Sequence, residues 1–350
     1  MVEKLFKVAI CHNANDIHLS EGIPPTLRIG GKMVRMQADP LTADDIERAM
    51  RALTPPRCMV ELSKSGNTDF GYDFGENRFR IAVFRQRGGI GMIMRHFRNT
   101  MFSLDELQIP QEVRTAMVRE RGLFIITGPT GSGKTTTMAT LIDHINANCS
   151  KNIITIEDPI EIVHAHKLCN VSQREIGVDV FTFADGVRCA MRHDPDVIVV
   201  GEMRDVATIR IALKAAETGH LVLGTLHART ASAVITRIIA EFASDEQDFI
   251  RMQLSNSLLG VINQVLIPTA DGNGVASVME ILMNTPSIAS LIRQSKENQI
   301  VDEIRKGKNL GMVIFEESLR QRCVNKVVDW REATHHSREP ETFKTRMEKK

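Results

Sequence analysis

The stretch "GPTGSGKTTT", residues 128–137, decides the fold of this chain. It satisfies the pattern G-x-x-x-x-G-K-[S/T], with the apolar run "LFIIT" at 123–127 directly before it and residues at helical spacing after it. A glycine-rich turn between a strand and a helix is the context in which this pattern forms a phosphate-binding loop. The sequence therefore predicts a nucleoside triphosphate site, and it leaves open whether hydrolysis modifies a small molecule or moves something.

The residues of this P-loop have separate predicted tasks. Glycines let backbone N–H groups approach the phosphates, and the N-terminus of the following helix adds positive potential. Lys134 is expected to bridge the β- and γ-phosphates of ATP, and Thr135 to ligate Mg²⁺. The predicted nucleotide-binding residues of the loop are Gly128, Gly131, Ser132, Gly133, Lys134, Thr135 and Thr136.

Downstream of the loop, short apolar runs alternate with segments of helical spacing. Near-continuous apolar runs suit strands that are covered on both faces in a parallel sheet. The predicted fold class is therefore α/β, and from about residue 245 onward the chain is expected to be mostly helical. The strands are expected at 123–127, 152–158, 197–202 and 221–227.

The first 100 residues follow a different pattern. Extended pieces are punctuated by glycine and proline, a helix is expected between Thr42 and Pro55, and alternating runs on either side of Gly88-Gly89 predict a β-hairpin. These features indicate a small α+β domain. We therefore expect an α+β domain, a linker and an α/β core with C-terminal helices, at residues 1–97, 98–111 and 112–350.

Composition limits the classes of protein to consider. Lys plus Arg number 44 and Asp plus Glu 43, so no broad basic face for nucleic acid is indicated, and we predict no nucleic-acid partner. No apolar run approaches the ~20 residues that span a bilayer, and the N-terminus lacks a signal-peptide pattern. The six cysteines form no C-x-x-C pair, which argues against a zinc site or disulfide framework. We expect a cytoplasmic protein.

Carboxylates follow two of the expected strands. "IEDPIE" places Glu157, Asp158 and Glu161 after the second strand, and Glu202 follows "VIVVG". Ligands of open α/β sheets collect at this carboxyl edge, where acids can hold magnesium and orient water. We predict Thr135, Glu202 and Glu157 as Mg²⁺ ligands and Glu202 as the Walker B carboxylate, against the alternative that these acids are solvated loop residues.

Two histidines flank the apolar strand at 221–227. His227 is expected at the carboxyl end of the strand, from which a side chain can sense the γ-phosphate. His220 lies at the other end, and a structural role there is as well supported by the sequence as a catalytic one.

Arginines gather on the predicted N-terminal hairpin. A motor ATPase commonly completes its site with positive charge from a neighbouring subunit or domain. The alternative is that these are exposed strand residues that keep the sheet edge soluble, and the sequence does not separate the two. The residues are Arg78, Arg80, Arg85, Arg87 and Arg95.

Together these motifs resemble the PilT/PilU group of type IV pilus retraction ATPases, within the wider superfamily of secretion ATPases. The resemblance is carried by "GPTGSGKTTT", "ITIEDPIEIVH", "VSQREIGVDV", "DPDVIVVGEMRD" and "AAETGHLVLGTLHA", in that order. Looser matches in "DIHLSEGIPPTLRIGG", "RFRIAVFRQRGG" and "FSLDELQIP" extend it over nearly the whole chain.

The resemblance implies a homohexameric ring of chains, each with a PAS-like N-terminal domain and a RecA-like ATPase core. It implies Glu161 as general base, and His220 with His227 as a His box. Arg80 and Arg95 would reach the nucleotide across the domain or subunit boundary. Hydrolysis would turn an inner-membrane platform protein at the pilus base, so that pilins leave the fibre and the cell moves by twitching.

The chain also departs from the group's pattern. "SIASLIRQ" at 287–294 has Ala289-Ser290 where retraction ATPases usually carry Arg-Asn, and "FRQRGGIGMIMR" resembles the PilU side. An accessory motor that works with a related retraction ATPase, or a paralogue that serves another fibre, therefore stays an alternative.

Three other classes can be compared with this reading. A P-loop small-molecule kinase would need a lid and an acceptor pocket, and would not explain the N-terminal domain or the two histidines. A non-hydrolysing ATP-binding adaptor would not need Lys134, Thr135, Glu161 and Glu202 together. A nucleic-acid translocase should show a basic surplus that the charge balance lacks.

Overall fold

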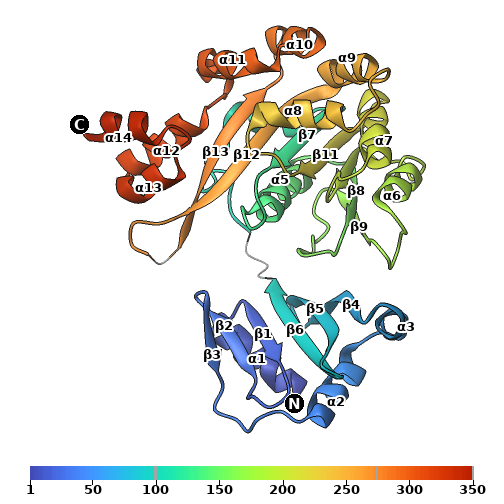
Figure 1. The fold of residues 1–350 in the computed structure, drawn as a ribbon. Coiled ribbons are helices and arrows are strands. Elements are labelled where there is room, and N and C mark those ends of the chain that lie inside the picture. The colour runs from blue at the N-terminus through green and yellow to red at the C-terminus, as the bar shows by residue number, and fades with distance from the viewer. Residues whose placement is uncertain (98–100, 273, 349–350) are drawn as a thin grey trace. The chain divides into compact units, whose positions relative to one another are not determined.

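The computed structural model describes residues 1–97, 101–272 and 274–348, which fold into two compact units (Figure 1). The first unit comprises Met1–Thr100 together with Pro159–Val163. The second comprises Met101–Asp158 and His164–Lys350.

In its described residues, the first unit is an antiparallel sheet with three helices. Its helices are α1 (Val2–Cys11), α2 (Ala43–Leu53) and α3 (Pro56–Ser65). Its strands are β1 (Asp16–Leu19), β2 (Thr26–Ile29), β3 (Lys32–Arg35), β4 (Asn67–Phe74), β5 (Asn77–Gln86) and β6 (Gly89–Phe97). They lie in the order β3-β2-β1-β6-β5-β4, and Phe6, Ile46 and Phe79 are among the side chains buried in the core.

Two local predictions in this unit are confirmed, one with a shift of a residue. Thr42 and Asp45 form a reciprocal capping box at the start of α2, which satisfies two backbone N–H groups that the helix leaves unpaired. The β5–β6 hairpin turns at Arg87 and Gly88, with φ of 47° and 82°, because a two-residue turn of this kind needs positive φ at both positions. Gly89 instead pairs with Gln86 as the first residue of β6.

The second unit is built on one seven-stranded sheet. Its strands are β7 (Gly122–Thr127), β8 (Asn152–Glu157), β9 (Asn170–Glu175), β10 (Val197–Val200), β11 (Leu221–Leu226), β12 (Leu258–Pro268) and β13 (Val275–Met283). They lie in the order β13-β12-β7-β11-β10-β8-β9. All neighbours are parallel except β12 and β13. The four strands predicted from apolar runs are confirmed to within two residues.

Helices cover both faces of this sheet. They are α4 (Gln111–Met117), α5 (Lys134–Asn148), α6 (Phe183–Ala190), α7 (Val206–Glu217), α8 (Ala231–Ala240) and α9 (Gln247–Ser257). Alternate residues of β7 enter two different buried clusters: Phe124 and Ile126 pack with α4 and α5, and Leu123 and Ile125 with the cluster that holds α6 to α9. Burial on both faces explains why the parallel strands are apolar without a break.

The prediction that the chain is mostly helical from residue 245 is wrong for residues 258–283. Here β12 and β13 form a long antiparallel hairpin, and β12 also pairs with β7. In β12 the β-branched residues Val261, Ile262, Val265 and Ile267 fit the pleated surface that β7 and β13 provide. The tertiary pairing therefore decides the structure of this segment.

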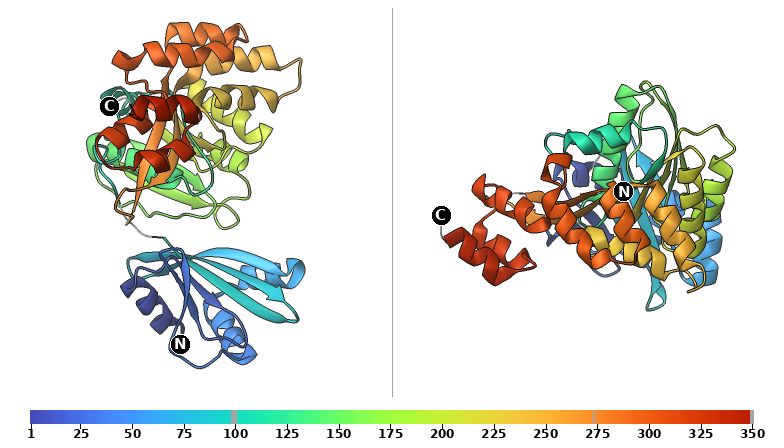
Figure 2. Two further views of the ribbon diagram at one scale, coloured as in Figure 1. Left: turned by 60° about the vertical axis from the view of Figure 1, so that its left-hand side comes forward. Right: turned by 90° about the horizontal axis from the view of Figure 1, so that it is seen from above.

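Short helices follow the hairpin, as predicted for the end of the chain. They are α10 (Pro286–Arg293), η1 (Glu297–Gln299), α11 (Ile300–Lys306), η2 (Lys308–Leu310), α12 (Phe315–Val324), α13 (Trp330–His336) and α14 (Pro340–Glu348). The last three, red in Figures 1 and 2, lie beside the orange hairpin. Phe315, Leu319 and Phe343 pack there against Ile267 and Val278.

The N-terminal segment of the second unit overlaps the predicted linker. The predicted linker at 98–111 begins at residues 98–100, which lie outside the described residues. Beyond them, Leu104, Leu107 and Ile109 are buried with the side chains of α4 and α5. At the edge of the sheet, β9 pairs with β8 and with no other strand among the described residues, and its sequence "NVSQRE" is mostly polar.

In the parts of the chain that the structure describes, no helix combines the length and the apolar character that crossing a membrane requires.

Candidate functional site: the P-loop and its surroundings

The P-loop connects the central strand β7 to α5. Gly128, Gly131 and Gly133 have φ of 149°, 78° and 82°, values that residues with a side chain rarely adopt. Gly133 is the N-cap of α5, so the first backbone N–H groups of this 15-residue helix face the loop. The predicted strand, turn and helix are therefore in place for binding an anion.

Space explains two of these glycines. A Cβ atom at Gly128 would lie 2.2 Å from the backbone oxygen of Gln264, and one at Gly133 would lie 2.9 Å from the Gln264 side-chain nitrogen. At Gly131, by contrast, a Cβ would meet nothing within 4 Å. The loop is thus packed closely on its β12 side and open at Gly131, as a cradle for phosphate must be.

A buried hydroxyl in the loop also fits a ligand. Ser132 Oγ is buried, and within the described part of the chain it has no hydrogen-bond partner. Buried polar atoms of this kind require an explanation, and a missing ligand is one of the common ones.

Lys134 lies folded against the loop. Its Nζ donates to the carbonyl oxygens of Gly128 and Pro129, each at 3.0 Å. The same Nζ is 3.5 Å from Nδ1 of His227. The ammonium group is therefore positioned at the mouth of the loop, beside the histidine at the end of β11.

Glu202 follows β10 by two residues and reaches the same place. Its Oε1 is 3.1 Å from Nε2 of His227, and Arg204 contacts both carboxylate oxygens at 2.5 Å. Burial raises the pKa of Glu202, but the hydrogen bond and charge of Arg204, with the charges of His227 and Lys134, outweigh it and hold the pKa below its usual value. Glu202 is therefore an ionised acceptor at neutral pH.

His227 connects the carboxylate to the P-loop. Nε2 faces Glu202, and Nδ1 lies 3.2 Å from the carbonyl oxygen of Gly128. Three residues predicted from separate parts of the sequence, Lys134, Glu202 and His227, are thus brought together at one edge of the sheet. Because the imidazole of His227 contacts both the loop and the carboxylate, it is in position to change its contacts when a phosphate binds.

Glu157, a predicted metal ligand, is engaged on its own strand pair. Its Oε1 accepts from the hydroxyl of Thr155 at 2.6 Å and from the side-chain amide of Gln173 at 3.0 Å. Among the described residues, no group of three or more acidic, histidine or cysteine side chains is arranged to hold a metal. The Mg²⁺ site of Thr135, Glu202 and Glu157 stays a prediction.

His220 is not brought to the P-loop. It precedes β11 whereas His227 follows it, and a six-residue strand is ~20 Å long. Its Nδ1 lies 3.0 Å from the carbonyl oxygen of Ala215. In this chain the contacts of His220 favour the structural alternative at the turn between α7 and β11.

The predicted Arg80, Arg95 and Glu161 all belong to the first unit. Arg80 and Arg95 are directly opposite each other on β5 and β6. Arg80 Nε lies 3.1 Å from Asp69, and Arg95 Nε lies 2.9 Å from the buried Asp16. Their predicted roles toward the nucleotide stay predictions.

Sequence reasoning missed the residues of β12 and β13 that support the loop. Gln264, 2% exposed, accepts from the Thr137 hydroxyl at 2.6 Å and donates to the Ser132 carbonyl at 2.8 Å. Glu280 in β13 is equally buried. The signal was present as polar residues inside the apolar runs "VINQVLI" and "SVMEILM", because a buried polar group needs a partner.

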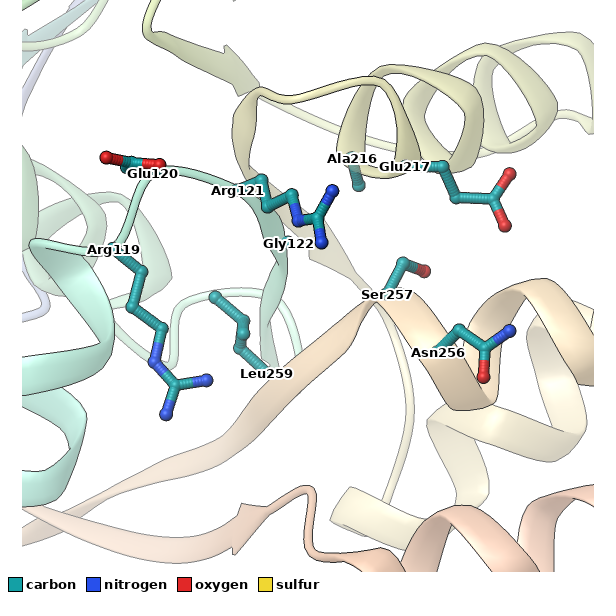
Figure 3. A pocket seen from close by; sticks show the side chains of 9 residues that line it. All are labelled: Arg119, Glu120, Arg121, Gly122, Ala216, Glu217, Asn256, Ser257 and Leu259. Carbon is teal, nitrogen blue, oxygen red and sulfur yellow. The ribbon is translucent and has the colours of Figure 1, made fainter.

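A separate hollow of ≈ 540 Å³ lies at the amino end of β7, away from the P-loop (Figure 3). Arg119 and Arg121 line one side, and Glu217 at the end of α7 lines the other. Glu217 accepts from the side chain of Gln253 at 2.6 Å. Neither a glycine-rich loop nor the start of a long helix faces it among the lining residues, so it does not compete with the P-loop as a triphosphate site.

Comparisons with known proteins agree with this geometry. A family model described as "Type II/IV secretion system protein" matches residues 1–349. The chain is 38% identical over 343 residues to the "Type IV pilus retractation ATPase PilT" of Pseudomonas aeruginosa, covering 98% of this chain and 99% of that protein. It is 33% identical over 336 residues to the type IV pilus ATPase PilU of the same organism, covering 96% and 88%.

A solved structure is similar over the same extent. The crystal structure of the pilus retraction motor PilT with bound ADP matches with a TM-score of 0.90 at 39% identity, covering 97% of this chain and 98% of that one.

Proposed function

This chain belongs to the type II/IV secretion system protein family, and from this premise we propose that it is a motor ATPase that couples ATP hydrolysis to retraction of a type IV pilus. The observation that carries the proposal is the contact of His227 with both Glu202 and the P-loop. A kinase places an acceptor pocket beside the γ-phosphate. Here that edge of the sheet instead holds a carboxylate and a histidine in contact.

Nucleotide binding uses the P-loop from Gly128 to Thr136. Backbone N–H groups at the start of α5 bind phosphate oxygens, and Lys134 exchanges its two carbonyl partners for the β- and γ-phosphates. Thr135, Glu202 and Glu157 would hold Mg²⁺, which would supply positive charge beside these phosphates. The closely packed β12 side of the loop keeps the backbone N–H groups fixed while this exchange takes place.

Hydrolysis requires a water molecule to be oriented toward the γ-phosphate. Glu202 is ionised and can accept a hydrogen bond from that water. His227 contacts Glu202 through Nε2 and the P-loop through Nδ1, so its hydrogen bonds change when the phosphate binds or leaves. By resemblance to the family, Glu161 is the general base. Arg80 and Arg95 supply positive charge from a neighbouring domain or subunit.

The assembly is proposed on the same resemblance. Six chains form a ring in the cytoplasm at the base of the pilus, against an inner-membrane platform protein. Each cycle of hydrolysis moves the N-terminal domains and turns the platform, so that pilins leave the fibre.

The first experiment compares phosphate release by the wild type and by Glu202→Gln, with MgATP and no added acceptor. We expect steady release by the wild type and a turnover roughly 10³-fold lower in the variant. The variant loses the ionised acceptor for the attacking water, and loss of one group positioned for the transition state costs on the order of 10²- to 10³-fold. Both should bind ATP. Glu241→Gln, an exposed glutamate at the end of α8, is the matched control and should keep the wild-type rate.

The same assay separates the alternatives. Release that requires a small-molecule acceptor would identify a kinase. Release that appears only after a related retraction ATPase is added would identify an accessory subunit, a possibility supported by the 33% identity to PilU. A Glu202→Gln variant with the wild-type rate would assign the catalytic carboxylate to another residue.

A further inference from the structure

The loop that carries His227 is held by side chains from several other parts of the chain. This loop, residues 227–230, joins β11 to α8. Thr127 at the end of β7 accepts from the Ala228 backbone N–H at 2.7 Å, and Asn263 in β12 donates to the Ala228 carbonyl at 3.1 Å. Arg237 in α8 donates to the His227 carbonyl at 2.7 Å, and Arg338 donates to the Arg229 carbonyl. Glu280 accepts from the backbone N–H of Ala231, the residue that follows the loop. His227 is therefore held in place from outside its own strand.

Arg338 reaches this loop from the far end of the chain. It lies between α13 and α14, and it donates to the Arg229 carbonyl at 2.9 Å and to Asn263 Oδ1 at 3.1 Å. Its guanidinium also donates to Glu280 Oε1 at 2.9 Å. One side chain thus contacts the loop, β12 and β13 at once.

Glu280 explains why a positively charged side chain is needed at position 338. Its side chain is 3% exposed; Oε1 accepts from Arg338 and Oε2 accepts from the backbone N–H of Ala231, the first residue of α8, at 2.7 Å. A buried carboxylate needs a paired charge and further hydrogen bonds to be tolerated. Arg338 supplies that charge from the C-terminal helices.

The C-terminal helices in turn hold Arg338. Glu316 in α12 accepts from the Arg338 backbone N–H at 2.7 Å and from the Ser337 hydroxyl at 2.8 Å. The guanidinium carbon lies 4.6 Å from the centre of the Phe315 ring, a stacked arrangement that arginine favours. The backbone and the ring contact of Arg338 are therefore fixed by α12, while its guanidinium group binds the loop 227–230 beside the P-loop.

We infer that Arg338 is a positioning residue for His227: it connects the C-terminal helices to the loop 227–230, and its contacts set the rate of hydrolysis and leave ATP binding unchanged. This inference rests on the proposed ATPase function. Arg338 does not touch the P-loop residues in any described contact, so its effect passes through the Arg229 carbonyl, Asn263 and Glu280.

The guanidinium group is essential to this role, and this provides a test. Lysine at position 338 could still pair with Glu280, but a single ammonium group cannot reproduce the planar fork that contacts Glu280, Asn263 and the Arg229 carbonyl together. Arg338→Lys should therefore keep the buried charge paired while releasing the loop. A merely structural role would be rescued by lysine, whereas a positioning role would not.

The experiment measures phosphate release, ATP affinity and melting temperature in the full-length chain. We expect Arg338→Ala and Arg338→Lys to lower kcat roughly tenfold while ATP affinity stays within about twofold, the signature of an interaction that acts on turnover. Arg338→Lys should melt near the wild type. Arg346→Ala, an exposed arginine on α14, is the matched control and should match the wild type in all three measurements.

A double-mutant cycle with His227 tests the route. If Arg338 acts through His227, His227→Ala combined with Arg338→Lys should be no slower than His227→Ala alone, within about twofold. Fully additive losses would overturn the inference, as would a wild-type kcat in Arg338→Lys.

Failure of the proposed function would look different. A wild-type chain that binds MgATP without releasing phosphate, alone or with a related ATPase, would remove the activity itself. Release by the wild type with an unchanged Arg338→Lys variant would instead leave the ATPase function intact and reject only the positioning role.

Discussion

Strands β7, β10 and β11 differ from the hairpin β12–β13 in where they carry polar side chains. The first three are buried throughout, and their functional groups come after the strand ends, at Gly128, Glu202 and His227. The hairpin carries Asn263, Gln264 and Glu280 within its strands, fully buried. The first group therefore places functional side chains at the carboxyl ends of its strands. The hairpin supports these side chains and the P-loop through buried hydrogen bonds.

The difference shows how a phosphate-binding loop is made rigid. A glycine-rich turn has high conformational freedom in the unfolded chain and must be fixed by its neighbours. Gln264 does this by closing on Ser132 and Thr137 from β12. The loop is thus specified by two segments more than a hundred residues apart.

Substitution of the glycines should give the largest effect. At Gly128, alanine combines a positive φ with a clash against the Gln264 backbone, and we expect the free energy of unfolding to fall by about 4 kcal/mol. At Gly131, alanine meets no neighbour and should lower it by about 1 kcal/mol, through φ alone. Urea unfolding of the nucleotide-free protein measures both, and equal losses would show that β12 does not constrain the loop.

Lys134→Ala tests the phosphate-binding residues at the carboxyl ends of the strands and does not test the β12–β13 hairpin that supports them. Loss of hydrogen bonds from a charged group to phosphate should weaken ATP binding by about 3 kcal/mol, roughly 100-fold, with little change in stability. Titration with a fluorescent ATP analogue measures the affinity. Lys214→Ala, an exposed lysine on α7, is the control. Unchanged affinity in Lys134→Ala would refute the role of this residue at the phosphates.

Gln264→Leu tests the contact of β12 with the loop, and its effect should be smaller than that of Gly128→Ala or Lys134→Ala. It leaves the Thr137 hydroxyl and the Ser132 carbonyl without their amide partner, which should lower the free energy of unfolding by about 2 kcal/mol. The exposed Gln294→Leu should change it by less than about 0.5 kcal/mol. Thermal or urea unfolding compares them, and a Gln264→Leu variant as stable as the control would remove the supporting role of β12.

The same comparison explains what the sequence could predict. The P-loop, the strands of the parallel sheet, Glu202 and His227 follow from local patterns, because an apolar run and the residues that end it are adjacent in the chain. Gln264 bonds to Ser132 across 132 positions, and no local pattern encodes that pairing. For the same reason, β12 and β13 were predicted as helical although their β-branched residues suit strands.

The surroundings of the two histidines at the ends of β11 are the other feature that the sequence could predict only in part. The sequence places His227 at the carboxyl end of the strand and leaves the role of His220 open. The structure adds the neighbours of each residue, because parallel pairing of β11 with β7 places His227 beside Gly128 and His220 beside Gly122. The parallel sheet therefore places only His227 at the P-loop, and the roles of both histidines stay predictions.

The polar edge strand β9 has a consequence for how the protein behaves when concentrated. An unpaired sheet edge is a template on which another chain can add a strand and begin an aggregate. In β9 the side chains of Asn170 and Ser172 are exposed and those of Gln173 and Arg174 are partly exposed. An incoming strand would have to desolvate these polar groups, so uncontrolled growth by strand addition is opposed at this edge. Contact between two copies at β9 is therefore disfavoured even when the protein is concentrated.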